Sequence, residues 1–308
     1  MFRVTNNMLV NDLRRNMNTN MYQLEKYNRQ LATTRKLNKP SDNPAGLIKS
    51  LSLRTDITES EQYLRNIGEV INYMETTDSA LNDIGSVLHR VRELTVKAAN
   101  STNDQTARDA IADEIKELTD QLKIVTNTTY GSKYIFGGSN VTEKPYQEDA
   151  GNLVWVGNDE GLEVEISTGI KFQYNVTNDS MRNFFIDIDN TDPASPVDKG
   201  IFAVLDKLEQ DIRSGDLPEV DAALGKLDEK MTDLLTAHST IGAKVNRLEL
   251  QQNRLEGTRI SFTDLLSQNE DADMAEVIMN LKMQENVYRS SLAAGARIIQ
   301  PTLIDFLR

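Results

Sequence analysis

Hydrophobic residues recur every seven positions near both ends of the chain but not in its middle. In the C-terminal half, one line of this repeat consists of Val220, Leu227, Leu234, Ile241, Leu248, Leu255 and Phe262. The N-terminal half contains two shorter lines with the same spacing: Met17, Leu24 and Leu31, and then Ile67, Met74, Leu81 and Leu88. Apolar positions spaced three and four residues apart form a stripe on one side of a helix, which other helices must cover. The pattern therefore predicts long helices that form a bundle.

The first helix is predicted to run from about Thr5 to Lys36 and to stop at Pro40. Asn43 can then cap a second helix, because its side chain accepts from free backbone N–H groups and Pro44 is tolerated in the first turn. We expect that second helix to continue to about Ala99.

The remaining helices are delimited by capping and turn residues. Thr102 and Gln105 form a capping-box pattern that predicts the start of a third helix. Helix resumes near Gly200 and, after a pause, continues as the long repeat to about Leu266. A turn at Asn269–Asp271 leads into the last helix.

The middle of the chain has a different sequence pattern, in which short β-like runs are separated by Gly, Asn and Asp. The runs cover residues 134–136, 153–156, 162–166 and 172–176. The fold class predicted from this layout is mainly α: a long antiparallel helical bundle or coiled coil with a small β-rich insertion domain. The chain would run out and back, with both termini at one end.

Three domains are predicted on this basis. Residues 1–45 and 265–308 would be the terminal helices, forming an assembly domain, which the family resemblance described below places in an inner core. Residues 46–130 and 200–264 would form a helical bundle domain, and residues 131–199 an acidic, β-rich outer domain.

The distribution of charge indicates which of these segments pair and which face solvent. Eight basic and two acidic residues give positions 1–39 a net charge of +6, whereas four basic and seven acidic residues give positions 264–308 a net charge of −3. The two terminal helices are therefore predicted to pair with each other. Positions 143–198 hold twelve acidic and three basic residues, net −9, as expected of a solvated outer surface. The overall net charge of −13 argues against a nucleic-acid partner.

Composition excludes further classes of protein. The chain has no cysteine, so disulfides and cysteine nucleophiles are ruled out. No apolar run approaches the roughly 18 residues of a membrane span, so no membrane partner is predicted. Met1–Asn7 begins no apolar signal-peptide core. We expect a protein that is either cytoplasmic or exported without a cleaved signal.

No catalytic, cofactor or metal site is predicted. The two histidines, His89 and His238, lie in helical repeats, where packing is the simpler interpretation. Asp187–Asp192 resembles the start of a calcium loop but lacks its glycine, which favours a plain acidic loop. Trp155 and Tyr174 with clustered carboxylates leave open a glycan-active module carried on a helical stalk, although no catalytic constellation supports it.

Several segments resemble the flagellin superfamily and, within it, the family of hook-filament junction proteins. The similar segments are residues 3–8, 31–46, 91–100, 134–138, 144–146 and 300–307. Thr34 departs from the pattern, because the family commonly has glycine at this position. The resemblance covers both ends and the domain junctions, but little of the acidic middle.

The resemblance implies a non-enzymatic structural subunit without cofactors, which joins the hook to the filament of the bacterial flagellum. Such a subunit is exported unfolded through the flagellar type III channel and is extracellular once assembled. The implied partners are copies of itself in a ring, the preceding hook-associated junction protein, flagellin and an export chaperone. A flagellin filament subunit remains the alternative within the superfamily. The family's terminal helices line an inner tube and are expected to order on assembly.

The assembly interface is predicted on the apolar stripes of the two terminal helices, which have few other elements to cover them. The predicted interface residues are Met17, Leu24, Leu31, Ile278, Leu281, Tyr288, Leu292, Ile299 and Phe306.

Overall fold

The computed structural model describes residues 6–100, 104–149, 152–158, 160–175, 184–185, 188–189, 197–198 and 200–299. The chain divides into two compact units. We refer to Met1–Glu59 with Gly257–Arg308 as the terminal unit, and to Ser60–Glu256 as the central unit. Each is described separately below.

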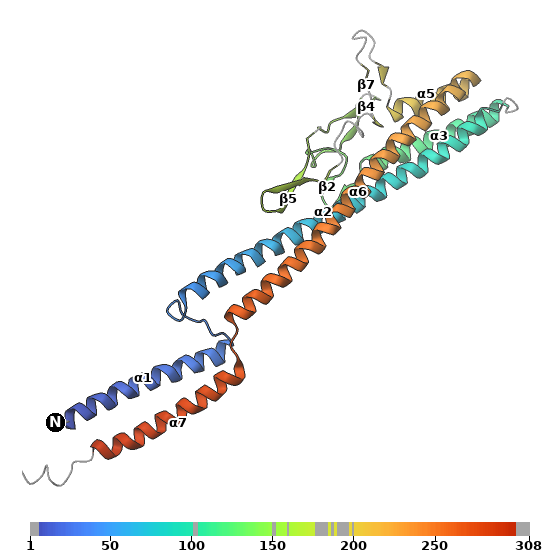
Figure 1. The fold of residues 1–308 in the computed structure, drawn as a ribbon. Helices are drawn as coiled ribbons and strands as arrows, with labels where there is room; N and C mark the ends of the chain where they lie inside the picture. Colours follow the sequence, from blue (N-terminus) through green and yellow to red (C-terminus); the bar gives the residue numbers. More distant parts are fainter. Residues whose placement is uncertain are drawn as a thin grey trace, which may run out of the picture. The chain divides into compact units, whose positions relative to one another are not determined.

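Within the described residues the protein is mainly helical (Figure 1). The helices are α1 (Asn6–Thr33), α2 (Pro44–Ala98), α3 (Gln105–Thr126), α5 (Ile201–Ser214), α6 (Leu217–Glu270) and α7 (Met274–Ile299). This confirms the predicted fold class of long helices with a small β-rich insertion between them.

The described strands are short and form four separate antiparallel pairs. These are β1 (Thr129–Tyr130) with β2 (Lys133–Tyr134), β3 (Tyr146–Asp149) with β4 (Asn152–Trp155), β5 (Glu163–Ser167) with β6 (Ile170–Gln173), and β7 (Ile188–Asp189) with β8 (Val197–Asp198). In β5, Val164 and Ile166 turn inward while Glu163 and Glu165 are exposed. This alternation leaves one face of the strand exposed to solvent.

The capping residues explain where the helices begin. The N–H of Gly46 donates to Asn43 Oδ1 at 3.0 Å, which confirms Asn43 as the cap of α2. The third helix differs from the prediction, because Asp104 caps it by accepting from the Ala107 N–H at 2.8 Å. Thr102 lies outside the described residues. Residues 101–104 are Ser, Thr, Asn and Asp, all good caps, so the sequence pattern could not select one of them.

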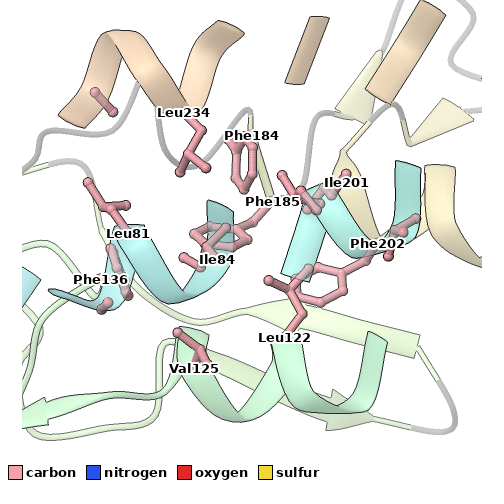
Figure 2. Packing of buried hydrophobic residues seen from close by; sticks show 14 of the residues in the cluster. Leu81, Ile84, Leu122, Val125, Phe136, Phe184, Phe185, Ile201, Phe202 and Leu234 are labelled. Carbon is pink, nitrogen blue, oxygen red and sulfur yellow. The ribbon is translucent and has the colours of Figure 1, made fainter. Parts of the chain in front are cut away.

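The central unit has an apolar core formed by α2, α3, α5 and α6 (Figure 2). Ile84, Leu88 and Leu122 have no exposed surface. Phe184 and Phe185 are also fully buried, and they bring part of the insertion into contact with the helices.

The aromatic rings of this core touch one another, edge to face in the Phe185–Tyr146 pair and stacked in the Phe185–Phe202 pair. The Phe185 ring lies 4.9 Å from that of Tyr146 and 5.8 Å from that of Phe202, measured between centroids. Rings at such spacings contribute beyond the area that they bury. The β-rich insertion is therefore anchored to α5 by packing.

The β5–β6 hairpin is anchored to α2 and α6 by polar contacts. Asn66 Nδ2 donates to the Glu165 carbonyl at 2.9 Å, and Lys244 Nζ donates to the Asn175 carbonyl at 3.2 Å. Burial lowers the pKa of Lys244. The carbonyl that its ammonium meets compensates part of this desolvation.

Candidate assembly surface

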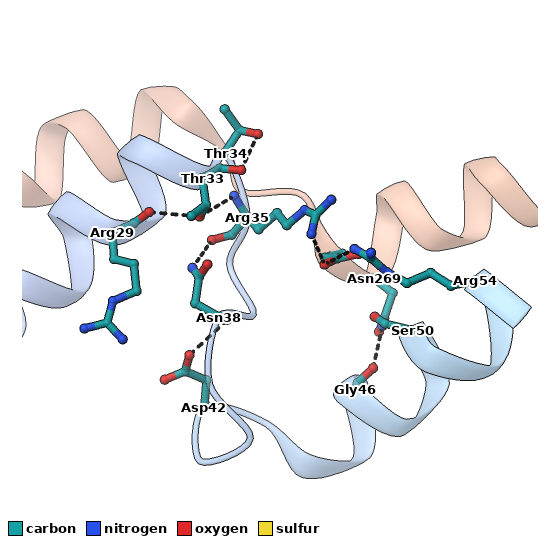
Figure 3. Close-up of polar contacts among 11 residues, drawn as sticks. Arg29, Thr33, Thr34, Arg35, Asn38, Asp42, Gly46, Ser50, Arg54 and Asn269 are labelled. Carbon is teal, nitrogen blue, oxygen red and sulfur yellow. Dashed lines mark hydrogen bonds and ion pairs between the residues drawn. The ribbon is translucent and has the colours of Figure 1, made fainter.

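The two breaks in the helices of the terminal unit lie side by side (Figure 3). The first follows α1, where Thr34 adopts a φ of 59°, in the left-handed region. Its carbonyl accepts from the Ala272 N–H at 2.9 Å, and the Lys36 N–H donates to the Glu270 carbonyl at 2.8 Å. The segment after α1 and the segment after α6 are therefore paired through their backbones.

A buried carboxylate joins the same two segments to α2. Glu270 is 7% exposed, and both its oxygens accept from Arg54 Nη2, at 2.7 and 2.8 Å. Arg35 Nη1 lies 3.2 Å from Glu270 Oε1. Asn269 Nδ2 donates to the Gly46 carbonyl at 2.8 Å and to Ser50 Oγ at 2.7 Å. We refer to Arg35, Arg54, Asn269 and Glu270 as the polar hub.

The loop between α1 and α2 is folded tightly against this hub. Leu37 is buried, and Asp42 Oδ2 accepts from the N–H groups of Asn38 and Lys39 at 3.1 and 2.9 Å. A Cβ on Gly46 would lie 2.9 Å from Leu37 Cδ1. A side chain at position 46 would therefore displace the Leu37 side chain and the capping Asn43 side chain.

The helices α1 and α7 pack against each other as an antiparallel pair within the terminal unit (Figure 1). Asn20 is at the centre of the contact: its Oδ1 accepts from Gln284 Nε2 at 3.2 Å, and its Nδ2 donates to Ser291 Oγ at 3.4 Å. At Gly295 the helices approach closely, because an added Cβ would lie 2.7 Å from Leu13 Cδ2. This confirms the predicted pairing of the two terminal helices. Among the described residues, the ion pair that joins positions 1–39 to positions 264–308 is Arg35–Glu270 at the polar hub.

The predicted interface residues fall into three groups. Met17, Leu24, Leu31 and Tyr288 are half-buried and Leu281 is 6% exposed. Met17 and Leu24 flank Asn20 on the face of α1 that meets α7. Ile278 and Leu292 are 46% and 43% exposed. The side chain of Ile299 and all of Phe306 lie outside the description. Contacts between copies through these residues stay a prediction.

A second apolar stripe, which the sequence reasoning missed, runs along the opposite side of α7. Met279, Met283 and Val287 are 64%, 56% and 41% exposed. Met283 follows Leu281 by two residues, so it points roughly 200° away from the side that α1 covers. The sequence does indicate this stripe, because Met279, Met283 and Val287 are spaced four residues apart. A pattern based on a seven-residue repeat does not include them. We refer to these three residues as the outer stripe.

The outer stripe is continued by small residues. A shallow hollow beside the outer stripe is lined by Met283, Asn286, Val287, Ser290, Ser291 and Ala294, and at Ser291 it reaches the residue that contacts Asn20 of α1. Small residues allow another backbone to approach, and methionine adapts its shape to a partner. The arrangement is suited to packing another helix and offers no group for catalysis.

The other candidates lie in the central unit or outside the description. His89 is exposed, and His238 Nε2 lies 2.9 Å from Asp78 Oδ1. Across the described part of the chain, no three His, Cys, Asp or Glu side chains gather as metal ligands would. Most of the acidic loop at 187–192 lies outside the described residues. None of the helices described is both long and apolar enough to cross a membrane.

Sequence comparisons match both ends of the chain to one family. The model of the bacterial flagellin N-terminal helical region matches residues 4–141, and that of the C-terminal helical region matches residues 224–307. Flagellin of Bacillus subtilis (strain 168) is 26% identical over 302 residues, which is 97% of this chain and 96% of that protein. Flagellar hook-associated protein 3 of Escherichia coli (strain K12) is 24% identical over 281 residues, 87% and 88% of the two chains.

A more similar relative aligns over a shorter length. Flagellin of Clostridium tyrobutyricum is 34% identical over 139 residues, which is 45% of this chain and only 37% of that flagellin. Among solved structures, a flagellar hook-associated protein of Vibrio parahaemolyticus has a TM-score of 0.66 at 21% identity, covering 75% of this chain and all of that one. Hook-associated protein 3 of Legionella pneumophila has a TM-score of 0.63 at 15% identity, covering 70% and 97%. These structures share the fold.

Proposed function

The chain belongs to the bacterial flagellin family, and from this premise we propose that it is a structural subunit that joins the hook to the filament of the flagellum. Its partners would be further copies of itself, a preceding hook-associated protein and flagellin. The resemblance of residues 3–8 and 300–307 to junction proteins supports the junction role. The full-length similarity to hook-associated protein 3 of Escherichia coli supports it further.

The outer stripe is the main observation that supports assembly through the terminal helices. Three large apolar side chains in one row are open to solvent on the side of α7 opposite α1. Each buried methylene contributes about 0.8 kcal/mol, so covering the row with a neighbour's helix would stabilise an assembly appreciably. We therefore assign residues 1–45 and 265–308 to assembly, residues 46–130 and 200–264 to a supporting bundle, and residues 131–199 to an acidic outer region.

The proposal includes how the protein is exported and where it acts. The chain would be exported unfolded through the flagellar channel with the help of a chaperone, and would act outside the cell. The absence of cysteine fits this route, because no disulfide has to be formed or reduced. The family's role is structural, and we propose no catalytic activity for this member.

Single-cysteine cross-linking tests the assembly surface, because a cysteine introduced into this cysteine-free chain is its only thiol. Met283→Cys, labelled with a short maleimide–diazirine reagent whose photoreactive end needs no second thiol, is expected to yield cross-links to a neighbouring copy or adjoining flagellar protein in assembled flagella. The matched control is Leu250→Cys, which is 72% exposed on α6 in the central unit. Mass spectrometry of the linked peptides identifies the partner.

A charge substitution gives a second measurement on the same surface. Met279→Glu with Met283→Glu is expected to leave the circular dichroism spectrum unchanged and to abolish incorporation into flagella, because the carboxylates would be buried without partners. Leu250→Glu should incorporate normally. Normal incorporation of the double variant would show that the outer stripe is not an assembly contact.

A filament subunit is the second candidate, favoured by the near full-length alignment with Bacillus subtilis flagellin. The two functions differ in where the protein lies and in whether it polymerises alone. Immunogold labelling of a tagged chain is expected to mark one band at the hook end of each filament. Labelling along the whole filament, with purified protein growing long filaments alone, would assign it to the filament instead.

A further inference from the structure

A cavity in the central unit lies between α2, the β1–β2 hairpin and the β5–β6 hairpin. Its volume is about 200 Å³. Its lining is Asn66, Glu69, Val70, Tyr73, Tyr130, Lys133, Glu163, Val164 and Tyr174. The assembly surface uses none of these residues, so the cavity needs a separate explanation.

Three tyrosines come together in this cavity from three different elements. The Tyr73 ring lies edge-on to Tyr130, with centroids 5.9 Å apart, and edge-on to Tyr174 at 5.0 Å. The Tyr73 hydroxyl is used inward, where it donates to the Ile135 carbonyl at 3.1 Å. Within the described residues, the Tyr130 and Tyr174 hydroxyls have no hydrogen-bond partner. Their rings and hydroxyls are therefore available to a ligand.

The lining of the cavity carries two carboxylates, Glu69 and Glu163, and one ammonium group, Lys133. Glu69 lies one turn before Tyr73 on α2, and Glu163 Oε2 lies 3.3 Å from Lys171 Nζ. Burial, and after it the negative charge of Glu69, raises the pKa of Tyr174. Glu69 therefore acts on the cavity electrostatically, and it has no ion-pair partner in the part of the chain that is described. Aromatic faces beside carboxylates attract cations.

The size of the cavity narrows the class of ligand. Pockets for drug-sized molecules usually measure about 300–1,000 Å³, so this one suits a single functional group. We propose that the cavity binds an alkyl-guanidinium or alkyl-ammonium group, with the cation against the tyrosine rings and Glu69. The source of the group is either an arginine or lysine side chain of another protein or a free organic cation.

The positive charge of Lys133 repels a cationic ligand, so removing Lys133 should change the affinity in the opposite direction to removing the charge of Glu69. It is exposed on β2 and lines the cavity as its only positive charge. Removing it should relieve repulsion of the incoming cation, whereas neutralising Glu69 should remove attraction. A neutral ligand would respond to neither change.

The experiment is a titration of the full chain, with ¹³C-labelled tyrosine rings followed by NMR. N-acetyl-arginine amide is the probe, and N-acetyl-citrulline amide is its uncharged match in shape. We expect the arginine compound to shift the Tyr130 and Tyr174 ring signals with saturation, and the citrulline compound to leave them unchanged. Binding should weaken about three- to fivefold in Glu69→Gln and strengthen by a similar factor in Lys133→Ala.

The matched control is Glu75→Gln, which makes the same charge change on an exposed position of α2 that does not line the cavity. It should bind as the parent does. Equal shifts by the citrulline and arginine compounds, or no shift at 100-fold excess, would overturn the proposal. The amide spectrum of each variant verifies its fold, so a loss of binding cannot be confused with unfolding.

The source of the cation is resolved by two further probes. If methylguanidine binds as tightly as an Ac-Gly-Arg-Gly-amide peptide, the site recognises the free cationic group alone. Tighter binding of the peptide indicates an arginine presented by another protein. Either result supports a cation site, and neither depends on incorporation into flagella.

Discussion

The two units contain the same heptad-like pattern but bury it to different extents. In the central unit the repeat residues Leu81, Leu88, Leu227 and Leu248 are at most 1% exposed. In the described part of the terminal unit, the buried hydrophobic residues are Leu37, Leu53, Val277 and Leu281. A stripe of given composition is therefore buried only as far as the surrounding elements cover it.

The number of covering elements explains the difference. Four helices and the β-rich insertion surround the core of the central unit, whereas α1 and α7 have mainly each other. The terminal unit compensates at one point with the polar hub, where Glu270 receives Arg35 and Arg54. We infer that apolar packing stabilises the central unit, whereas the terminal unit depends on a few polar contacts and on partners.

The largest expected effect is a cavity in the central core. Leu88→Ala should lower the free energy of unfolding of the central unit by about 3–5 kcal/mol, because Leu88 has no exposed surface and the core is enclosed on every side. Urea denaturation monitored by circular dichroism measures it. Leu250→Ala, at a residue that is 72% exposed, should change this free energy by less than about 0.5 kcal/mol. Equal losses in the two variants would contradict the enclosed core.

The same substitution in the terminal unit should cost less and act locally. Leu281→Ala is expected to destabilise the α1–α7 pair by about 2 kcal/mol, because one side of this pair can relax toward solvent. Amide hydrogen exchange should speed up in α1 and α7 and stay unchanged in the core around Leu88. Faster exchange throughout both units would mean that they unfold together, and the comparison would fail.

The polar hub gives a third test of how the terminal unit is held. Glu270→Gln keeps one acceptor oxygen but loses the charge that Arg54 and Arg35 meet, so we expect a loss of about 1–2 kcal/mol. Both arginines are more than 40% exposed, which reduces the effect below that of a fully buried pair. Exchange at the ends of α2 and α6 near Asn269 measures it. Glu59→Gln, on an exposed position of α2, should leave exchange there unchanged.

Much of the division into a terminal and a central unit could be predicted from the sequence. The breaks near Pro40 and Asn269, the pairing of the terminal helices and the β-rich insertion all follow from local signals: capping residues, charge and spacing. The outer stripe could not be separated from the inner one, because α7 is apolar on two sides and a single sequence does not say which side α1 covers.

Contacts between distant residues could not be predicted either. Tyr73, Tyr130 and Tyr174 meet in one cavity, although they come from α2 and from two segments of the insertion. Glu270 pairs with Arg54 across 216 positions. Neither pairing has a characteristic spacing, so only the fold reveals it.

The smallest expected effect is a gain in stability at the corner after α1. Thr34 has a φ of 59°, a conformation that costs an L-residue about 1–2 kcal/mol and glycine little. Thr34→Gly should therefore stabilise the terminal unit by about 1 kcal/mol, after the larger entropy of glycine in the unfolded chain is subtracted. Slower amide exchange at Ala272, whose N–H donates to the Thr34 carbonyl, measures this gain. Thr33→Gly, at the last residue of α1, should have the opposite sign, because it removes the hydroxyl that accepts from the Arg35 N–H at 3.3 Å and adds the larger unfolded-state entropy of glycine. If Thr34→Gly also destabilised the corner, then the hydrogen bond that the Thr34 hydroxyl donates to the Thr33 carbonyl, at 2.6 Å, would contribute more than the backbone strain costs. The terminal unit would then depend even more on polar contacts than the hub alone indicates.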